Sequence, residues 1–234
     1  MRRDPNRRTI RWAATVLATG AALTAAAVVP TGTAAQEIDA GRLEVHQDGR
    51  RVAIESFRVW EAGANLNAGG SIEPVGNSGG EFQVGVALDA QLRPVRYELR
   101  GPGARVITGA WSVDRVRLHT ITDEGERWRE LASRGAGSVL EVGVAHHHLV
   151  LVRVLEGGGG RATVVVPLRG EAVDAQLVGQ RSDEVTIDGR GIAATRYDLR
   201  IGGSQSSVWV DAEGRLLRVV DGSSGLEAIR LAPG

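Results

Sequence analysis

The 234-residue sequence contains no cysteine and no lysine. Without cysteine the chain forms no disulfide, no thiolate metal site and no iron–sulfur cluster, and it cannot carry a lipid on a cysteine after a signal peptide. Without lysine it has no P-loop lysine, so its glycine runs do not predict a phosphate-binding loop. Aromatic residues make up only 4% of the chain, which leaves no stacking platform for single-stranded nucleic acid.

The chain also lacks an excess of charge of either sign. Its 28 basic residues are all Arg and are matched by 28 Asp and Glu residues. A formal charge of zero argues against a strongly basic nucleic-acid-binding protein. The 32 glycines and 42% hydrophobic residues follow neither a collagen repeat nor a coiled-coil heptad.

Residues 1–35 have the three-part pattern of a secretory signal peptide. Five arginines among the first eleven residues form a positive start, and a weakly apolar stretch follows from Trp12 to Val29. Small residues at Thr33 and Ala35 suit cleavage before Gln36. We therefore expect an exported protein, periplasmic or extracellular. An uncleaved membrane anchor is the alternative, and the export route, Sec or twin-arginine, stays open.

Cleavage would change the charge of the protein. It would remove five of the 28 Arg and one of the 28 acidic residues. The remaining 23 basic and 27 acidic residues give a formal charge of −4. We expect no nucleic-acid partner, and no spanning segment once the signal is removed. Residues 36–234 are long enough for a single β domain with one sizeable core.

Alternation of apolar and polar residues dominates residues 36–234 and predicts antiparallel strands. Residues 43–46 and 51–60 flank Asp48-Gly49, a hairpin turn whose residues tolerate positive φ. A glycine-, asparagine- and serine-rich segment, residues 61–80, is predicted to be a flexible loop. Further strands at spacings near those of a meander are predicted at residues 82–88, 94–100, 105–113, 115–122, 127–134, 139–142, 161–168, 170–180, 184–189, 191–201, 206–211, 215–220 and 225–231.

One segment breaks this alternation. Residues 145–155 contain no glycine or proline and favour one buried helix, although Val150, Val152 and Val154 favour a strand. We therefore predict an all-β fold with one minor helix near residues 145–155. The strands would form a curved antiparallel sheet, an incomplete β-barrel around an apolar core or cavity.

A short charged pattern occurs twice. Asp89-Ala90 followed by Arg93 recurs as Asp211-Ala212 followed by Arg215. The two copies lie in different hairpin contexts, so they do not define a tandem repeat.

Gly76-Asn77-Ser78-Gly79-Gly80 matches the G-x-S-x-G pattern of serine hydrolases. That mechanism needs a strand before the serine and a helix after it, whereas a glycine-rich loop precedes Ser78 and a strand follows it. Loop composition explains the string, and we predict no catalytic residue.

His146-His147-His148 is the densest cluster of titratable side chains. On a strand His146 and His148 would share a face, whereas on a helix adjacent residues diverge. Zinc needs about four ligands, and no H-x-E or HExxH motif accompanies the cluster, so we expect no metal and no cofactor. A partly buried helix start with imidazoles bonded to the backbone, or a pH-sensitive plug, are the remaining interpretations. His46 and His119 are expected on strand surfaces.

The order of elements resembles the periplasmic lipoprotein-carrier superfamily, and specifically its uncharacterised exported bacterial half-barrel branch. Three stretches carry the resemblance: the opening hairpin of residues 43–52, residues 140–155 followed by Val164-Val165-Val166-Pro167, and the closing hairpin of residues 208–219. The resemblance implies a curved antiparallel sheet around an apolar cavity, partly plugged by helix. It also implies non-covalent handling of lipid or acyl chains, and it transfers no functional residue.

Binding or carriage of a lipid or other apolar ligand in the cell envelope is therefore the first hypothesis. Trp60, Trp111 and Trp209 are candidates for the mouth of a cavity, and His146 and His148 are further candidate ligand-binding residues.

The alternative is a non-enzymatic envelope assembly or interaction subunit with a filled core, which would bind a protein partner through a sheet edge or residues 61–80. An enzyme is the third hypothesis. It requires Ser78, His146 or His148 to meet a carboxylate in space.

Overall fold

The computed structural model describes residues 35–76, 80–133 and 137–232, which belong to one compact unit. Residues 1–34 of the expected signal peptide, and Ser78, lie outside the described residues. The expected all-β class with one minor helix is confirmed for this part of the chain. Within it, no helix combines the length and apolar character needed to cross a membrane.

Strands β1 to β8 form the N-terminal half of the sheet. Their bounds are β1 Gln36–Gln47, β2 Arg50–Ala62, β3 Asn65–Pro74, β4 Phe82–Leu88, β5 Pro94–Arg100, β6 Val106–Trp111, β7 Arg115–Thr122 and β8 Gly125–Ala132.

The C-terminal half contains the helix and the remaining strands. Their bounds are β9 Gly137–Val139, α1 His146–Gly157, β10 Arg161–Val166, β11 Glu171–Ile187, β12 Arg190–Ile201, β13 Ser204–Val210, β14 Leu216–Asp221 and β15 Leu226–Arg230.

All the strands join in one sheet, in the order β8-β7-β6-β5-β4-β3-β2-β1-β15-β14-β13-β12-β11-β10-β9. Each half is an antiparallel meander, and the two halves meet where β1 pairs with β15. The exception is β9, which runs parallel to β10 and is connected to it through α1. Parallel neighbours need such a crossover, because a tight turn cannot connect them.

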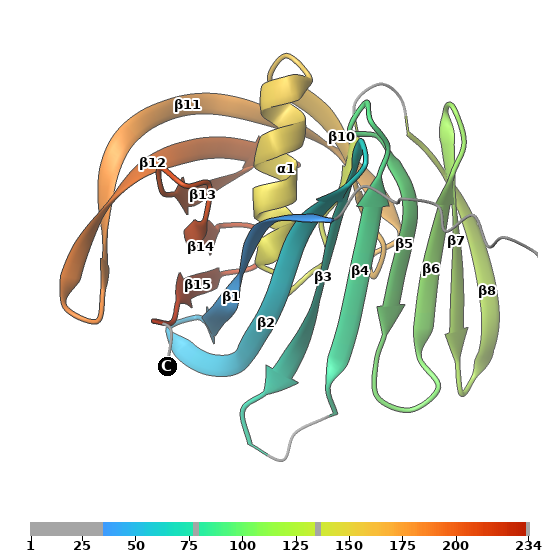
Figure 1. The fold of residues 1–234 in the computed structure, drawn as a ribbon. Coiled ribbons are helices and arrows are strands. Elements are labelled where there is room, and N and C mark those ends of the chain that lie inside the picture. The colour runs from blue at the N-terminus through green and yellow to red at the C-terminus, as the bar shows by residue number, and fades with distance from the viewer. Residues whose placement is uncertain (1–34, 77–79, 134–136, 233–234) are drawn as a thin grey trace, which may run out of the picture. The chain divides into compact units, whose positions relative to one another are not determined.

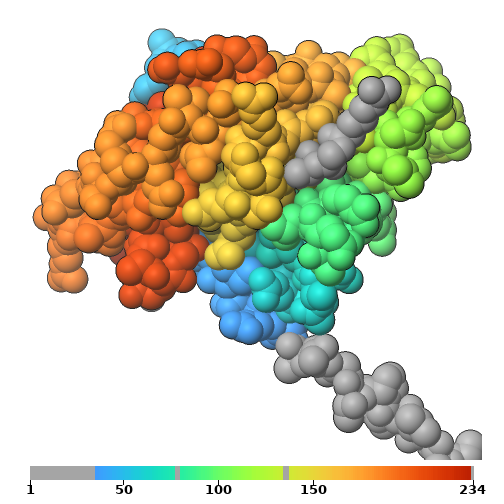
Figure 2. All heavy atoms as spheres, turned by 90° about the horizontal axis from the view of Figure 1, so that it is seen from above, coloured from blue at the N-terminus to red at the C-terminus, as the bar shows by residue number. Residues whose placement is uncertain are grey.

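The sheet curves around α1, which stands inside the bend (Figure 1). The helix contacts β3 from one half and β10, β11, β13 and β14 from the other. Seen from above, the yellow segment that contains α1 lies between the green and orange strands (Figure 2). The two outer strands, β8 and β9, lie at opposite ends of the strand order, so the sheet is an open barrel. The predicted incomplete β-barrel is therefore confirmed.

Helix α1 is buried on nearly every side, and this decides between the two interpretations of residues 145–155. Nine of its twelve residues are buried, including Val150, Val152 and Val154. A helix that is apolar all round belongs in a core, and the packing outweighs the modest cost of β-branched residues. The interior of the barrel is thus filled by side chains of the sheet and of α1.

Half of the loop predicted at residues 61–80 is instead strand β3, Asn65–Pro74. Its inward positions Leu66, Ala68 and Ile72 are buried, and Gly70 occupies the inward position between Ala68 and Ile72. A Cβ at Gly70 would lie 2.6 Å from the carbonyl oxygen of Ser56. The glycines that suggested a loop serve close packing here, and the loop prediction was wrong for these residues.

The segments predicted as separate strands at residues 170–180 and 184–189 form one long strand, β11. Its polar middle stays extended because β12 pairs with it from Ala175 to Ile187. The far end of this hairpin buries Val185 and Ile187 in a second small core with Trp209 and Leu217.

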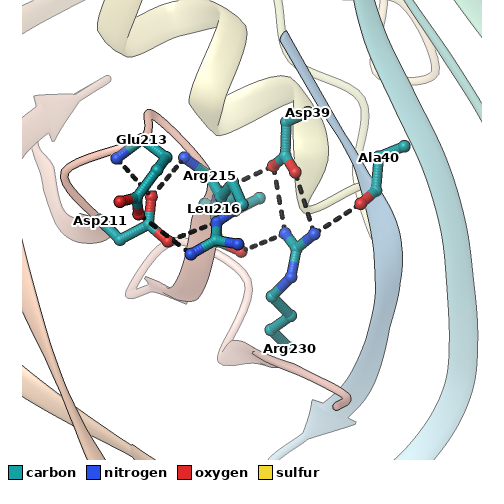
Figure 3. A network of polar contacts seen from close by, with 7 residues as sticks. All are labelled: Asp39, Ala40, Asp211, Glu213, Arg215, Leu216 and Arg230. Carbon is teal, nitrogen blue, oxygen red and sulfur yellow. Dashed lines mark hydrogen bonds and ion pairs between the residues drawn. The ribbon is translucent and has the colours of Figure 1, made fainter. Parts of the chain in front are cut away.

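A buried ion pair clamps the joint between the two halves (Figure 3). Asp39 on β1 has a fully buried carboxylate, which lies 3.0 Å from a guanidinium nitrogen of Arg230 on β15. The same carboxylate accepts the backbone N–H of Leu216 at 2.8 Å, and Arg230 donates to the carbonyl of Leu216 at 2.9 Å. A Cβ at Gly41 would lie 2.6 Å from Arg230, so glycine there makes room for the clamp.

The repeated charged pattern forms the same turn twice. Asp89 accepts the backbone N–H of Gln91 and Arg93 and pairs with the Arg93 side chain. Asp211 does the same with the backbone of Glu213 and Arg215 and with the Arg215 side chain (Figure 3). Aspartate favours such turns because its short side chain bonds to the backbone two residues on.

Candidate functional site

The start of α1 is held by a carboxylate from another part of the chain. Glu55 on β2 accepts the backbone N–H groups of Ala145 at 2.7 Å and His146 at 2.9 Å. Its Oε1 also lies 2.6 Å from Nδ1 of His146. Both side chains are fully buried. Glu55 thus satisfies backbone donors that a helix leaves unpaired, and its charge suits the positive end of the helix.

His147 connects the helix to the backbone of Glu141. Its Nδ1 accepts the backbone N–H of Glu141 at 3.1 Å, so Nδ1 carries no proton. Burial, with the neighbouring imidazoles of His146 and His148, holds the pKa of His147 well below its ordinary value of 6.5. The ring is therefore neutral at neutral pH.

The Glu141 carboxylate ties three segments together. It accepts the hydroxyl of Tyr97 on β5 at 2.6 Å and the backbone N–H of Leu168, in the turn between β10 and β11, at 3.2 Å. Burial raises the pKa of Glu141, although the hydrogen bonds from Tyr97, Val142 and Leu168 oppose this. Burial and the nearby Glu141 likewise raise the pKa of Tyr97 well above 10.0.

His148 completes the cluster, which we call the histidine latch: Glu55, Glu141 and residues 146–148. Burial lowers the pKa of His148, and the negative charge of Asp221 on β14 partly opposes this. Its Nδ1 lies 3.3 Å from the carbonyl of Ala145. The Nε2 atoms of all three histidines are buried without a hydrogen-bond partner.

The latch does not form a metal site or an open catalytic dyad. In the described part of the chain, no group of three or more His, Asp or Glu residues converges in a way that could hold a metal ion. His146 does meet a carboxylate, as the enzyme hypothesis required. Its ring is stacked on Phe57, however, with ring centres 5.6 Å apart, and neither His146 nor Glu55 is exposed. Substrate has no access to this pair.

Two cavities open on either side of the turn between β10 and β11. The first, of about 280 Å³, is lined by the carboxylates of Glu141, Glu171 and Asp221 and by Arg169. The second, of about 480 Å³, lies between that turn and the edge of the sheet at β7 and β8. We call the second cavity the edge trough. Its size is within the range usual for small-molecule sites.

The edge trough combines apolar side chains with guanidinium groups. Leu118 is buried at its base and Leu168 is 48% exposed. Three arginines line it: Arg127 and Arg129 from β8 and Arg169 from the turn. Guanidinium groups bind carboxylate, phosphate or sulfonate oxygens in a bidentate manner.

Arg129 is positioned by the turn it faces. Its Nη1 donates to the carbonyls of Gly170 at 2.7 Å and Arg169 at 3.2 Å. Gly170 has φ +61°, and a Cβ there would overlap the guanidinium of Arg129. The pair therefore bridges the open edge of the barrel between β8 and the start of β11.

Most carboxylates near this edge are engaged on its other face. Glu130 pairs with Arg117 at 3.0 Å, and Glu126 lies 2.9 Å from His119. In the alternating register of β8, these glutamates point away from Arg127 and Arg129. The charge that faces the trough is consequently positive, moderated by Glu171, which lies 3.5 Å from Arg169, and by Glu124, which lies 3.8 Å from Arg127.

The three tryptophans proposed for a cavity mouth lie in three separate places. Trp60 is half-buried on the outer face beneath Arg58, beside Gly69. Trp111 at the end of β6 packs against Gly109. Trp209 is buried between Arg196 and Arg218, with each guanidinium 4.9 Å from its ring, and it donates to Asp183 at 2.8 Å. They do not form one site.

The histidines named from the sequence contact neighbouring parts of the fold. His146 and His148 are buried at 0% and 2% exposure, in the helix start that was one interpretation of the cluster. His46 lies half-buried on β1 beside Glu44, and His119 on β7 is stacked on Trp128 with ring centres 3.8 Å apart.

Sequence reasoning missed Glu55, Tyr97 and the trough arginines. A signal was available for Glu55, because it occupies the inward register of β2 with Phe57 and Val59. A charged residue at such a position needs a buried partner. Arg127 and Arg129 share the inward register of β8, but only the tertiary structure shows what faces them.

Neither a family model nor a curated protein sequence matches this chain. A similar solved structure is that of a beta-barrel-like protein of the domain of unknown function DUF1849 from Brucella abortus. It has 5% sequence identity and a TM-score of 0.47, and the match covers 84% of this chain and 95% of that one. The resemblance to lipoprotein carriers remains a prediction.

Proposed function

We propose that this protein is a non-enzymatic binding protein that holds a small amphiphile with an anionic group in the edge trough. The observation that carries the proposal is a cavity of about 480 Å³ in which three arginines stand beside the apolar side chains of Leu118 and Leu168. An alkyl or acyl chain would lie on the apolar side chains, and its acidic head would pair with the guanidinium groups.

The filled barrel favours a ligand at the edge over a ligand inside. Side chains of α1 occupy the space where a half-barrel carrier would hold its cargo. A ligand at the edge trough stays partly open to solvent, which suits a charged head group because that group keeps much of its hydration.

We also propose that the protein acts outside the cytoplasm, after export and signal cleavage. Support comes from the signal-like pattern of residues 1–35. The first strand begins at Gln36, the residue that cleavage would make the new N-terminus.

The ligand class is tested by calorimetric titration of the purified protein with three dodecyl amphiphiles below their micelle concentrations. Dodecane sulfonate is anionic, dodecyl maltoside is neutral and dodecyltrimethylammonium is cationic. We expect the sulfonate alone to bind. Equal binding of all three would contradict a role for the arginines.

Two matched variants locate the site. Arg129→Gln removes a trough guanidinium and should weaken sulfonate binding by about tenfold, the loss of one charge-assisted pair. Arg117→Gln alters an exposed arginine on the opposite face of the same edge and should leave the affinity unchanged. If both variants bind like the wild type, the ligand does not occupy the edge trough.

An assembly subunit is the second candidate function, and the exposed edge strand favours it. Seven of the eight residues of β8 are exposed, and β8 ends the sheet. An outer strand can accept a strand from a partner, although charges on it discourage such pairing. Native mass spectrometry of the protein purified from its own envelope separates the candidates. A co-purified amphiphile supports the first, and a stoichiometric protein partner supports the second.

A further inference from the structure

We propose that a hollow on the outer face of the sheet binds one sugar ring of a neutral glycan, with Trp60 as the stacking residue. The hollow has a volume of about 220 Å³ and lies over β3 and β4, between Trp60 on β2 and the pair Arg96 and Glu98 on β5. Gly69 and Gly85 form its floor, and we call it the glycine hollow. It shares no lining residue with the edge trough, so this inference goes beyond the proposed function and does not depend on it.

The floor contains glycines that the fold itself does not require. Gly69 on β3 and Gly85 on β4 are direct partners in the sheet, and neither has a positive φ. A Cβ at Gly85 would lie 3.9 Å from its nearest neighbour, whereas a Cβ at Gly70 would clash with the backbone. Glycine in a strand interior weakens the strand and is typical of a site where a ligand approaches the backbone closely. The glycine at position 85 therefore indicates an external occupant.

The indole of Trp60 forms one wall of the hollow. A Cβ at Gly69 would lie 3.8 Å from Cη2 of Trp60, so the six-membered ring borders the floor. The guanidinium of Arg58 lies 5.2 Å from the centre of the indole and is itself paired with Glu37 at 3.1 Å. These contacts hold the indole in place at the side of the hollow. Its flat, electron-rich surface suits the weakly positive C–H groups on one face of a sugar ring.

The opposite wall supplies hydrogen-bonding groups without net charge. Arg96 donates to one oxygen of Glu98 at 2.8 Å, and Arg100 lies 2.5 Å from the other oxygen. The side chain of Arg96 is 75% exposed, and a guanidinium has five N–H donors, which is more than this pair uses. The charges of Arg96 and Glu98, which both line the hollow, cancel. A neutral hydroxylated ligand can therefore use both groups, whereas an ion gains little net attraction.

The size of the hollow limits the occupant to a single ring. Its volume is below the range of about 300–1,000 Å³ that is usual for drug-sized ligands. A flat apolar face for the indole and a hydroxyl-bearing edge for Arg96 and Glu98 are both present in a pyranose with equatorial hydroxyls, as in β-1,4-linked glucose. So small and open a site binds one ring with a dissociation constant of about 1 mM, so dilute dodecyl maltoside would leave it largely empty.

The experiment is an NMR titration of the nitrogen-15-labelled protein with cellotetraose, to about 10 mM. We expect the indole N–H resonance of Trp60 and the amide resonances of Gly69 and Gly85 to shift and to saturate. The indole resonance of the buried Trp209 should stay in place. Sorbitol has similar hydroxyl groups but no ring face, so it should produce no saturable shift.

Two matched variants locate the sugar. Gly85→Val fills the hollow with a residue that suits a strand, so it should fold and should weaken cellotetraose binding at least tenfold, as an approximate figure. Ala110→Val, on the exposed position of β6 opposite Arg96, enlarges a side chain on the same face outside the hollow and should leave binding unchanged. Thermal unfolding confirms that both variants fold. Both should bind dodecane sulfonate like the wild type, which keeps this test separate from that of the edge trough.

Trp60→Ala removes the stacking wall and should also weaken cellotetraose binding at least tenfold, as an approximate figure. Absence of a saturable shift with cellotetraose overturns the proposal, as does an equal shift with sorbitol. Undiminished binding by Gly85→Val would show that the sugar does not occupy the hollow. A saturable shift of the Trp60 indole with dodecane sulfonate would assign the hollow to an amphiphile and overturn the sugar class.

Discussion

Glu55 is a single residue on which the start of α1 depends. Its carboxylate accepts two backbone N–H groups and faces the ring of His146, all out of contact with water. Removing one partner from such a buried hydrogen-bonded group leaves the other partners unsatisfied. The loss of free energy is then larger than the stabilisation that the intact group provides.

Glu55→Gln should therefore lower the free energy of unfolding by about 3 kcal/mol, because the amide replaces one acceptor oxygen with a donor. Urea unfolding followed by circular dichroism measures the change. Glu44 and His46 form a half-exposed pair on β1, the strand next to β2. Glu44→Gln is therefore the control and should change the free energy of unfolding little. A loss below about 1 kcal/mol for Glu55→Gln would show that the cap is not needed.

Asp39 acts at the joint between the two halves in a similar way. Asp39→Ala leaves Arg230, only 15% exposed, without its carboxylate, and it frees the backbone N–H of Leu216. We expect a loss of about 3 kcal/mol in the free energy of unfolding, measured in urea. Removal of the exposed carboxylate of Glu130 should have no measurable effect. Equal effects of the two variants would contradict a structural role for the clamp.

At the scale of elements, β2 and α1 lie so close to β3 that one position of β3 must be glycine. A Cβ at Gly70 would meet the backbone of Ser56 at 2.6 Å and the ring of His146 at 3.2 Å. The backbone atom cannot move without disturbing the pairing of β2 with β3.

Gly70→Ala should lower the free energy of unfolding by about 2 kcal/mol through overpacking. Gly85→Ala on the adjacent strand is the matched control, because the nearest atom lies 3.9 Å from the added carbon. That control should be neutral or slightly stabilising, since alanine restricts the unfolded chain. Thermal unfolding compares the two variants, and a neutral Gly70→Ala would mean that the strand relaxes freely.

At the scale of the whole molecule, the buried titratable groups set the response to pH. The pKa values of His147 and His148 are lowered in the folded protein, so below pH 6.5 the unfolded chain binds protons that the folded protein excludes. The contribution of these two neutral imidazoles to the free energy of unfolding is complete above pH 6.5 and declines as the pH falls below it. Glu141 has the opposite sign: its raised pKa favours the folded state as the pH falls toward 4.5.

The free energy of unfolding should therefore fall as the pH drops below about 6.5, by at most about 1.4 kcal/mol per pH unit for each imidazole. Urea unfolding at a series of pH values measures this decline. A His147→Asn variant should show a shallower slope, and His46→Asn should match the wild type. Constant stability from about pH 7.5 to about pH 5.5 would contradict the assignment of neutral buried rings.

Local rules predicted much of the fold from particular residues. Asp48-Gly49 forms the expected hairpin turn, with φ values of 51° and 76°. Asp89 and Asp211 make the same turn because an aspartate side chain acts within a few residues. The helix was predicted because residues 145–155 contain no glycine or proline, and α1 begins at His146.

The failures occurred where distant residues decide the outcome. Gly70 was assigned to a loop because the groups that require glycine there, the ring of His146 and the backbone of β2, lie elsewhere in the chain. The partner of His146 is a carboxylate 91 residues away. No local pattern places these groups together.

The sequence by itself determined the secondary structure of most segments, the single helix and the exclusion of cysteine and lysine chemistry, because these depend on side-chain type and on near neighbours. Only the tertiary structure decided that the barrel is filled, that His146 meets the buried carboxylate of Glu55, and that three arginines line a trough at the open edge. These features arise because curvature of the sheet brings β2 and β5 to the start of the helix and β8 to the turn after β10, and strand curvature is a property of the whole sheet.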